Sequence, residues 1–214
     1  HGPVPEVNLG GGFGVAYVPS DKAPAITDLA EGIAKQVAEV CASTGSDLPR
    51  FVFEPGRSII APTGTTLYRV GTTKDVVVTA KDGQDAVRRY VSVDGGMGDN
   101  LRPAIYGAQY CVRMANRASD APPQLVRVVG SHCESGDVVV HNDYLPDDVA
   151  PGDVLAVPVT GAYCFSMASN YNYTPRPAIV AVRDGSAKTL VRRVEVHDLL
   201  AYDTAIQSVE GHNA

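Results

Sequence analysis

The 214-residue sequence predicts an α+β chain in which a short β/α region precedes a longer all-β domain of the sandwich or barrel type. Residues 1–57 follow the order strand, glycine-rich loop, helix and strand, which is a βαβ pattern. Residues 58–194 show no long helical pattern and contain instead short runs rich in Val, Thr and Tyr. Hydrophobic residues make up 44% of the chain, so it can bury a substantial core.

The first region contains two expected strands and one expected helix. Residues 5–9, PEVNL, predict a short buried strand, and residues 50–56, RFVFEPG, predict a second strand that ends at Pro-Gly. Residues 24–43 predict a helix, because apolar residues recur on one face at helical spacing. These are Ile26, Leu29, Ala30, Ile33, Val37, Val40 and Cys41. Thr27 and Asp28 are expected to cap the start of this helix, and a glycine lies just past its end.

The second region contains a succession of expected strands. Eight runs are separated by Gly, Pro, Asp and Asn, which is typical of a β-sandwich or β-barrel. The runs are TTLYRVGTTKDVVVTA, RRYVSVDG, AQYCVRMA, QLVRVVGSH, DVVVHNDYL, DVLAVPVTGAY, RPAIVAVRDG and TLVRRVEV. Residues 195–203, EVHDLLAYD, predict a closing helix.

Charge and cysteine content narrow the classes of protein to consider. The formal net charge of −6 disfavours general binding to nucleic acid or to an anionic membrane. No apolar run approaches the roughly 18 residues of a membrane span, and no signal peptide is visible. The four cysteines do not form the close pairs of a zinc site and are too sparse for a disulfide framework, so we expect no metal and a reducing cytoplasm. Because the first residue is His1, we expect the chain to begin inside a longer or processed protein.

Three consecutive glycines, Gly10, Gly11 and Gly12, follow the first expected strand. Glycine loses more backbone freedom on folding than any other residue, so three in a row suggest that something approaches the backbone closely. A phosphate is one candidate, since free N–H groups at a strand-to-helix turn bind anions. A tight turn is the other interpretation, and the motif alone leaves both open.

A second candidate motif, EPGR at residues 54–57, lies where an expected strand ends. In an α/β fold, ligands bind at that edge of the sheet. Glu54 could hold a protonated ring nitrogen, and Arg57 could hold a phosphate or carboxylate through two parallel hydrogen bonds. The motif taken alone favours a Pro-Gly turn with a solvated ion pair.

The β-rich region carries three further candidate segments. HCESGD, residues 132–137, places Cys133 beside an acid between two expected strands, while the adjacent histidine should point to the opposite face. DGGMGDNLRPAIYG, residues 94–107, predicts a loop whose Arg102 and Tyr106 could meet an anionic substrate. TGAYCFSMASNYNY, residues 160–173, is a loop of small residues with Tyr163, which could equally be a half-buried packing residue.

The order of these motifs along the chain is more specific than any one of them. NLGGGFGVAY, EPGR, DGGMGDNLRPAIYG, CESGD and GAYCFSMASNYN together resemble the diaminopimelate decarboxylase family, from Val7 to about Asp203. Members of this family use pyridoxal 5′-phosphate (PLP), belong to the fold-type III decarboxylases with an alanine-racemase-like barrel, and make L-lysine from meso-2,6-diaminopimelate. CESGD and GAYCFSMASNYN are the most distinctive pieces, since ornithine decarboxylases typically carry a shorter Cys-Asp motif.

The resemblance implies a set of cofactor-binding residues. The triple-glycine loop would hold the PLP phosphate through backbone N–H groups. Glu54 matches the residue that faces the pyridine nitrogen and keeps it protonated, which makes the ring an electron sink. Pro55, Gly56 and Arg57 match positions near the phosphate, and Tyr163 matches a residue that touches both phosphate and substrate.

The resemblance also implies residues that act on the substrate. Arg57, Arg102 and Tyr106 match carboxylate-binding positions. Glu134 matches a contact to the substrate amine, and Cys133 matches the general acid that returns a proton after CO2 is lost. The loop with Cys133 and Glu134 is expected to reach across a two-fold interface, so the resemblance implies a homodimer with shared active sites.

The same resemblance predicts the domain organisation. Residues 1–60 would be the last two β/α units of a (β/α)8 PLP-binding barrel, residues 61–203 the C-terminal β-domain, and residues 204–214 a tail. The lysine that binds PLP covalently belongs to earlier barrel strands, and no lysine here lies in a matching motif, so we expect the chain alone to be inactive. Two alternatives remain open: a related decarboxylase acting on ornithine or arginine, and a non-catalytic β-domain that serves subunit assembly.

Overall fold

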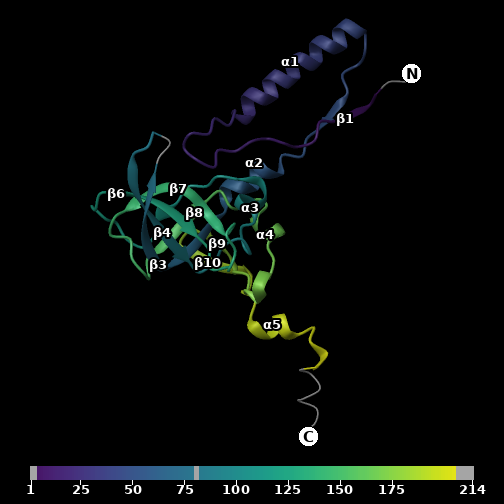
Figure 1. Ribbon diagram of the computed structural model, residues 1–214. Helices are drawn as coiled ribbons and strands as arrows, with labels where there is room; N and C mark the ends of the chain where they lie inside the picture. The colour runs from purple at the N-terminus through teal and green to yellow at the C-terminus, as the bar shows by residue number, and fades with distance from the viewer. Residues whose placement is uncertain (1–3, 80–81, 206–214) are drawn as a thin grey trace.

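The structure is a computed structural model that describes residues 4–79 and 82–205. Its N-terminal region consists of β1 (Glu6–Asn8), α1 (Ile26–Thr44) and β2 (Arg50–Val52). The two strands pair in parallel, so the predicted βαβ pattern is confirmed. Figure 1 shows this region projecting from one end of a compact β-rich body.

Helix α1 begins earlier than its expected capping residues. Its N-cap is Ala25, whose side chain makes no capping hydrogen bond, so the prediction that Thr27 and Asp28 cap the helix is wrong. Both residues lie inside the first turn, where the negative charge of Asp28 still complements the helix dipole. The C-terminal prediction is confirmed, because Gly45 adopts a left-handed φ of 66° and its N–H bonds the Cys41 carbonyl.

The β-rich body is a nearly closed six-stranded mixed barrel with strand order β5-β8-β3-β4-β6-β7. The strands are β3 (Thr65–Thr79), β4 (Asp85–Val93), β5 (Arg113–Met114), β6 (Pro123–Val129), β7 (Val138–Pro146) and β8 (Val154–Pro158). Neighbours are antiparallel except β4 and β6, which are parallel. β3 is long enough to pair with β8 along its first half and with β4 along its second, with a register shift between Val70 and Thr72. This irregular point lets one strand serve two sides of the barrel.

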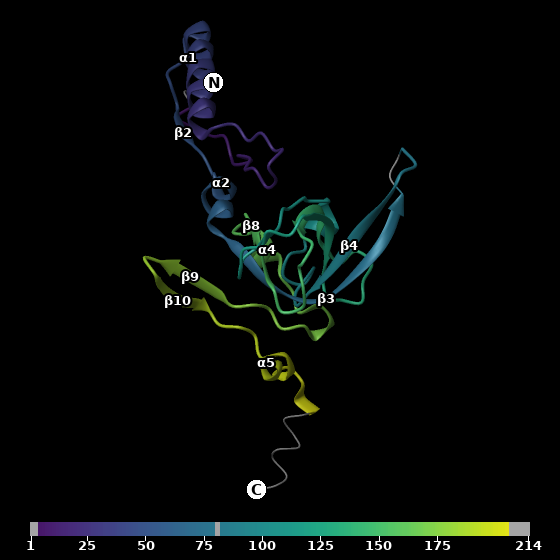
Figure 2. The same ribbon diagram turned by 90° about the vertical axis from the view of Figure 1, so that its left-hand side faces the viewer.

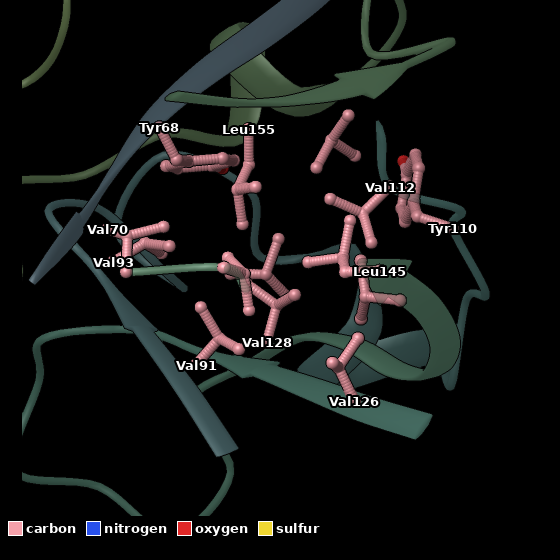
Figure 3. Close-up of a cluster of buried hydrophobic side chains, with 14 of the residues drawn as sticks. Tyr68, Val70, Val91, Val93, Tyr110, Val112, Val126, Val128, Leu145 and Leu155 are labelled. Atoms are coloured by element: carbon pink, nitrogen blue, oxygen red, sulfur yellow. The ribbon is translucent and has the colours of Figure 1, made fainter. Parts of the chain in front are cut away.

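Valine side chains dominate the barrel core, as Figure 3 shows. Alternate residues of each strand point inward, for example Tyr68 and Val70 on β3 and Leu155 and Val157 on β8. The remaining buried apolar members of the cluster are Val91, Val93, Tyr110, Val112, Val126, Val128, Val139, Val140, Leu145, Val149 and Cys164. The alternation of apolar and polar residues that predicts the strands therefore also directs the core side chains into the barrel.

The last two predicted strands do not join the barrel. β9 (Ile179–Arg183) and β10 (Ser186–Val191) form a separate antiparallel hairpin, which Figure 2 shows extending from the body. Every residue of β10 is exposed. The predicted closing helix is confirmed as α5 (Val196–Leu200), which begins with a capping box between Glu195 and Asp198.

The connecting segments contain short helices that the sequence did not distinguish from loops. They are α2 (Gly56–Ile60), η1 (Ala61–Thr63), α3 (Arg102–Tyr106), α4 (Cys164–Met167) and η2 (Tyr171–Tyr173). The run AQYCVRMA, predicted as a full strand, contributes only the two residues of β5. Within the described residues, no helix combines the length and the apolar character needed to cross a bilayer.

Candidate functional site

The geometry of the loop explains why each of its three consecutive positions is a glycine. Gly10 and Gly12 adopt left-handed φ values of 71° and 87°, which favour glycine. Gly11 lies against the backbone of Glu54, where an added Cβ would approach the Glu54 carbonyl oxygen to 2.6 Å. The loop is therefore a tight turn that also packs directly on the segment carrying Glu54.

Asn8 connects the glycine loop to Glu54. Its side-chain amide donates a hydrogen bond of 2.7 Å to Glu54 Oε1, and its Oδ1 accepts one of 2.7 Å from the Gly10 N–H. The Glu54 N–H in turn donates to the Gly10 carbonyl at 2.7 Å. Asn8 was missed as a site residue by sequence reasoning, and its only local signal is an amide side chain two positions before the first glycine.

Open hydrogen-bond donors remain in this part of the site. Within the described residues, nothing accepts a hydrogen bond from the N–H groups of Gly11 and Gly12. The Arg57 Nε atom is buried and also has no partner there. Free backbone N–H groups in a glycine turn and an unpaired guanidinium donor are the groups that bind phosphate. These residues fit the phosphate of the cofactor that the resemblance implies.

Arg57 and Tyr163 are brought together from distant parts of the chain. Arg57 lies in the first turn of α2, and its guanidinium carbon is 5.6 Å from the centre of the Tyr163 ring. Tyr163 has an unusual φ of 22° just before α4 and is 43% exposed. A cation over an aromatic ring is attractive, and the strained backbone aims this ring at Arg57.

Arg102 and Tyr106 share helix α3 but have different surroundings. Arg102 is only 7% exposed, donates a hydrogen bond to the Tyr110 hydroxyl and lies 4.5 Å from the centre of the Tyr17 ring. Tyr106 is 67% exposed. The Tyr110 hydroxyl also lies 3.5 Å from the Cys164 sulfur, and burial raises the pKa of both groups. Arg102 therefore keeps its charge beside neutral partners and ties the N-terminal region to the β-barrel through Tyr17.

Cys133 and Glu134 occupy the turn between β6 and β7, and both are exposed. The Glu134 N–H donates to the His132 carbonyl at 2.8 Å, and the Ser135 hydroxyl lies 3.3 Å from Glu134 Oε1. The His132 ring is buried and lies 3.0 Å from the Asp137 carboxylate, whereas Cys133 beside it is exposed. In the described part of the chain, no hydrogen bond joins Cys133 or Glu134 to the glycine loop or to Glu54.

The structure thus groups part of the expected site and separates the rest. Gly10, Gly11 and Gly12 lie with Glu54, and Pro55 and Gly56 link Glu54 to Arg57, which meets Tyr163. Among the residues that the structure describes, no hydrogen bond links the turn with Cys133 and Glu134 to these residues. All four cysteines are free thiols, and in the described ranges no three His, Cys, Asp or Glu side chains gather as a metal site would require.

Comparison with known proteins identifies a family. The family described as "Pyridoxal-dependent decarboxylase, C-terminal sheet domain" matches residues 23–161. The diaminopimelate decarboxylase of Mycobacterium tuberculosis is 53% identical over 197 residues, which are 92% of this chain and 43% of that protein. The Bacillus subtilis enzyme of the same name is 45% identical over 92% of this chain and 43% of its own length.

A solved structure agrees with these sequence matches. The diaminopimelate decarboxylase of M. jannaschii, in complex with L-lysine, superposes with a TM-score of 0.81 at 34% identity. The match covers 92% of this chain and 42% of that one. The chain therefore spans less than half the length of the relatives that it matches.

Proposed function

This chain belongs to the pyridoxal-dependent decarboxylase family, and from that premise we propose that it is the C-terminal part of a diaminopimelate decarboxylase. The complete enzyme would release CO2 from meso-2,6-diaminopimelate and form L-lysine. The observation that carries this proposal is the high identity to diaminopimelate decarboxylases over nearly the whole chain. The related ornithine and arginine decarboxylases are the competing assignment, and the experiment below separates them.

The cofactor-binding half of the site would be built by the glycine loop and the segment after β2. The N–H groups of Gly11 and Gly12, with the unpaired Arg57 Nε, are suited to the phosphate. The Glu54 carboxylate, oriented by Asn8, is suited to hold the proton of the pyridine nitrogen. When bound, PLP supplies an electron sink for the electron pair left by the departing carboxylate.

Residues of the β-rich region would bind the substrate and move a proton. Arg102 and Tyr106, together with Arg57 of the N-terminal region, are proposed to hold carboxylate groups, and Tyr163 to touch both phosphate and substrate. Glu134 would bind the distal amine by charge. Cys133 would donate its thiol proton to the α-carbon, because it is a free thiol that lies exposed on its turn, where a substrate can reach it.

We propose that the active site is shared between two subunits of a homodimer. Within the described residues, no hydrogen bond joins Cys133 or Glu134 to the glycine loop of the same chain, so a symmetric partner would supply them. We assign residues 1–60 to the last two β/α units of a (β/α)8 barrel, residues 61–203 to the C-terminal β-domain and residues 204–214 to a tail. The lysine that binds PLP covalently would belong to the part of the relatives beyond this chain's match, and we place the enzyme in the cytoplasm.

The test uses the full-length protein that contains this chain, purified with PLP. CO2 release and amino-acid product are measured with meso-diaminopimelate, L-ornithine and L-arginine at equal concentrations. We expect L-lysine from meso-diaminopimelate and far slower turnover of the other two. Faster turnover of ornithine or arginine would assign a related decarboxylase, and a folded, PLP-loaded protein inactive on all three would favour an assembly role.

A further inference from the structure

The Asp137 carboxylate is buried at the base of the turn that carries Cys133 and Glu134. Its side chain is only 2% exposed. Oδ2 accepts hydrogen bonds from the His132 backbone N–H at 2.7 Å and from the His132 ring Nδ1 at 3.0 Å. Oδ1 accepts a third, of 2.6 Å, from the Met97 N–H. The carboxylate thus joins its own turn to the loop of residues 94–99.

Two glycines make room for this carboxylate. An added Cβ would lie 2.3 Å from an Asp137 oxygen at Gly96 and 2.1 Å from one at Gly130. The first glycine belongs to the 94–99 loop and the second to the end of β6. Side chains larger than hydrogen at either position would push the carboxylate out, so both loops are shaped around it.

The His132 ring extends the same contact to a third segment. Its side chain is 1% exposed, and its ring centre lies 5.7 Å from that of Tyr171. An added Cβ at Gly98 would meet its Nε2 at 3.0 Å. The Gly98 carbonyl in turn accepts a hydrogen bond of 2.9 Å from the Ser169 N–H. His132 is therefore packed between the 94–99 loop and the segment that follows α4.

We propose that Asp137 and His132 are positioning residues that hold the Cys133–Glu134 turn in a fixed place relative to helix α3. The 94–99 loop leads directly into α3, which carries Arg102 and Tyr106. Because the proposed dimer is symmetric, fixing this loop to the 132–137 turn in each subunit sets where the proton donor of one subunit meets the substrate-binding side chains of the other. This inference rests on the proposed function, because it assigns the pair a consequence for the reaction.

The geometry of the contact suits two acceptor oxygens on Asp137. The backbone N–H groups of Met97 and His132 donate to them, and the His132 Nδ1 completes the contact in the tautomer that carries its proton on Nδ1. An asparagine would turn an NH2 group toward one of these donors and leave it buried without a partner. His132 needs only its Nδ1 donor for this contact, and an asparagine amide can supply a donor at a similar place.

The experiment compares four variants of the full-length, PLP-loaded enzyme: Asp137→Asn, His132→Leu, His132→Asn and Asp153→Asn. Asp153 is the matched control, a buried aspartate that accepts a backbone hydrogen bond elsewhere in the β-rich body. For each variant we measure kcat, KM, PLP content, melting temperature and, by hydrogen exchange, the protection of the Met97 and His132 amides. Melting temperature separates a general loss of stability from a change in kcat.

We expect Asp137→Asn and His132→Leu to lower kcat by about 10- to 100-fold, because a displacement near 1 Å of a reacting group costs that much. PLP content should stay the same, and the Met97 and His132 amides should exchange faster in Asp137→Asn. His132→Asn should recover most of the kcat that His132→Leu loses. Asp153→Asn should lower the melting temperature while kcat stays near that of the unmodified enzyme.

The inference is overturned if Asp137→Asn loses no more kcat than Asp153→Asn at a similar loss of melting temperature. It is also overturned if His132→Asn is no better than His132→Leu, and this comparison decides the matter if Asp137→Asn does not fold. Failure of the proposed function has a different signature, since the unmodified enzyme would then prefer ornithine or arginine or act on none of the three substrates, or Cys133→Ala would keep full activity. With Cys133→Ala inactive and the positioning variants active, the inference alone fails.

Discussion

The N-terminal region and the β-barrel of this chain differ in how their residues are packed. Between residues 4 and 60 no side chain is buried, and even α1, with 19 residues, has none. In the barrel, by contrast, Val91, Val126 and Leu155 are all 0% exposed. Both regions have strong apolar periodicity in sequence, yet within the described residues only the barrel strands bury their apolar side chains fully.

The two halves of the candidate site differ in the same property, the burial of the residues that support them. Buried side chains of the barrel hold the turn with Cys133 and Glu134 in place, so the conformation of this turn depends on this chain alone. The glycine loop and Glu54 rest on a βαβ unit whose apolar side chains, such as Ile26 and Val40, remain 51% and 60% exposed. The difference teaches that one half of the site rests on a buried core, while the other rests on a helix, α1, that has no buried residue.

The largest expected effect concerns the half of the site that the barrel holds. In the full-length enzyme, Cys133→Ala should lower kcat by about 10²–10⁴-fold, the usual contribution of a general acid. Cys111→Ala, which changes a half-buried thiol elsewhere, should leave kcat unchanged.

Mixing subunits then tests whether this half acts across a dimer. A Cys133→Ala subunit combined with one lacking the PLP-binding lysine should form heterodimers that regain about one intact site of two. Mixed dimers without activity would mean that the turn serves its own chain.

Core substitutions compare the packing of the two regions directly. Leu155→Ala should reduce the free energy of unfolding by about 2–5 kcal/mol, because it leaves a cavity in a closed core. Ile26→Ala should change it by less than about 0.5 kcal/mol in the 214-residue chain, since that side chain is already half exposed. Urea titration of both variants provides the measurement.

Measuring the free energy of unfolding of both variants in the full-length protein tests the difference between the two regions more strictly. If residues 1–60 complete a (β/α)8 barrel there, Ile26→Ala should become clearly destabilising, while the cost of Leu155→Ala should not change. An Ile26→Ala effect that stays near zero in both contexts would contradict the assignment of residues 1–60 to barrel units.

A smaller effect is expected at the carboxylate of the N-terminal half. Glu54→Gln should lower kcat of the full-length enzyme by about 10- to 100-fold, because the hydrogen bond to a charged partner is worth about 1.5–3 kcal/mol. PLP affinity should fall less than kcat, since the proton on the pyridine nitrogen matters most as negative charge develops. Steady-state kinetics and PLP titration check this, and an unchanged kcat would remove Glu54 from the role.

The smallest effects concern one ion pair in each region. Arg117 donates two hydrogen bonds to Asp153, of 2.8 and 2.9 Å, and holds the pKa of that carboxyl well below its usual range. Arg117→Gln should lower the melting temperature at pH 7 by a few degrees, about the shift that a modest loss of stability produces. Arg50→Gln should have no measurable effect, because the Arg50 and Glu6 side chains are 75% and 45% exposed.

The pH dependence of the Arg117 effect has a definite sign. Because the folded-state pKa of Asp153 is lowered, its stabilisation is fully present above the unfolded carboxyl pKa of about 3.9 and is lost as pH falls through the folded value. The difference between Arg117→Gln and the unmodified protein should therefore shrink in acid. An equal fall in melting temperature for Arg50→Gln and Arg117→Gln would contradict the contrast between the regions.

Much of the fold could be predicted from local patterns. Apolar spacing placed α1 and its glycine C-cap, and alternation placed β3, β4, β6, β7 and β8. The β9–β10 hairpin was also predicted as strands, but its separation from the barrel was not, since alternation says that a strand exists and not where its partner lies. The observed start of α1 differs from the predicted one, because Ala25 occupies the N-cap in place of a polar residue.

The residues of the candidate site also differ in how far the sequence could predict them. Its glycine loop and Cys133 stand out in sequence because glycine is costly in ordered structure and a cysteine on a loop can be reactive. Glu54 and Arg57 were predicted only through the order of the motifs along the chain. Asn8, by contrast, bonds a residue 46 positions away, and no spacing in the chain signals that contact. Asp137 was visible only as part of CESGD, with nothing local to indicate that Met97 would be its partner.

The sequence by itself determined the order of the main strands and of helices α1 and α5, the resemblance to PLP-dependent decarboxylases and the residue types of both halves of the site, because periodicity and motif order are local properties. Only the tertiary structure decided which loops meet: Gly11 against Glu54, Arg57 under Tyr163, and Asp137 between the 94–99 loop and the Cys133 turn. These contacts join residues far apart in the chain, and they form because barrel closure brings distant strand ends together and buried polar groups must find partners.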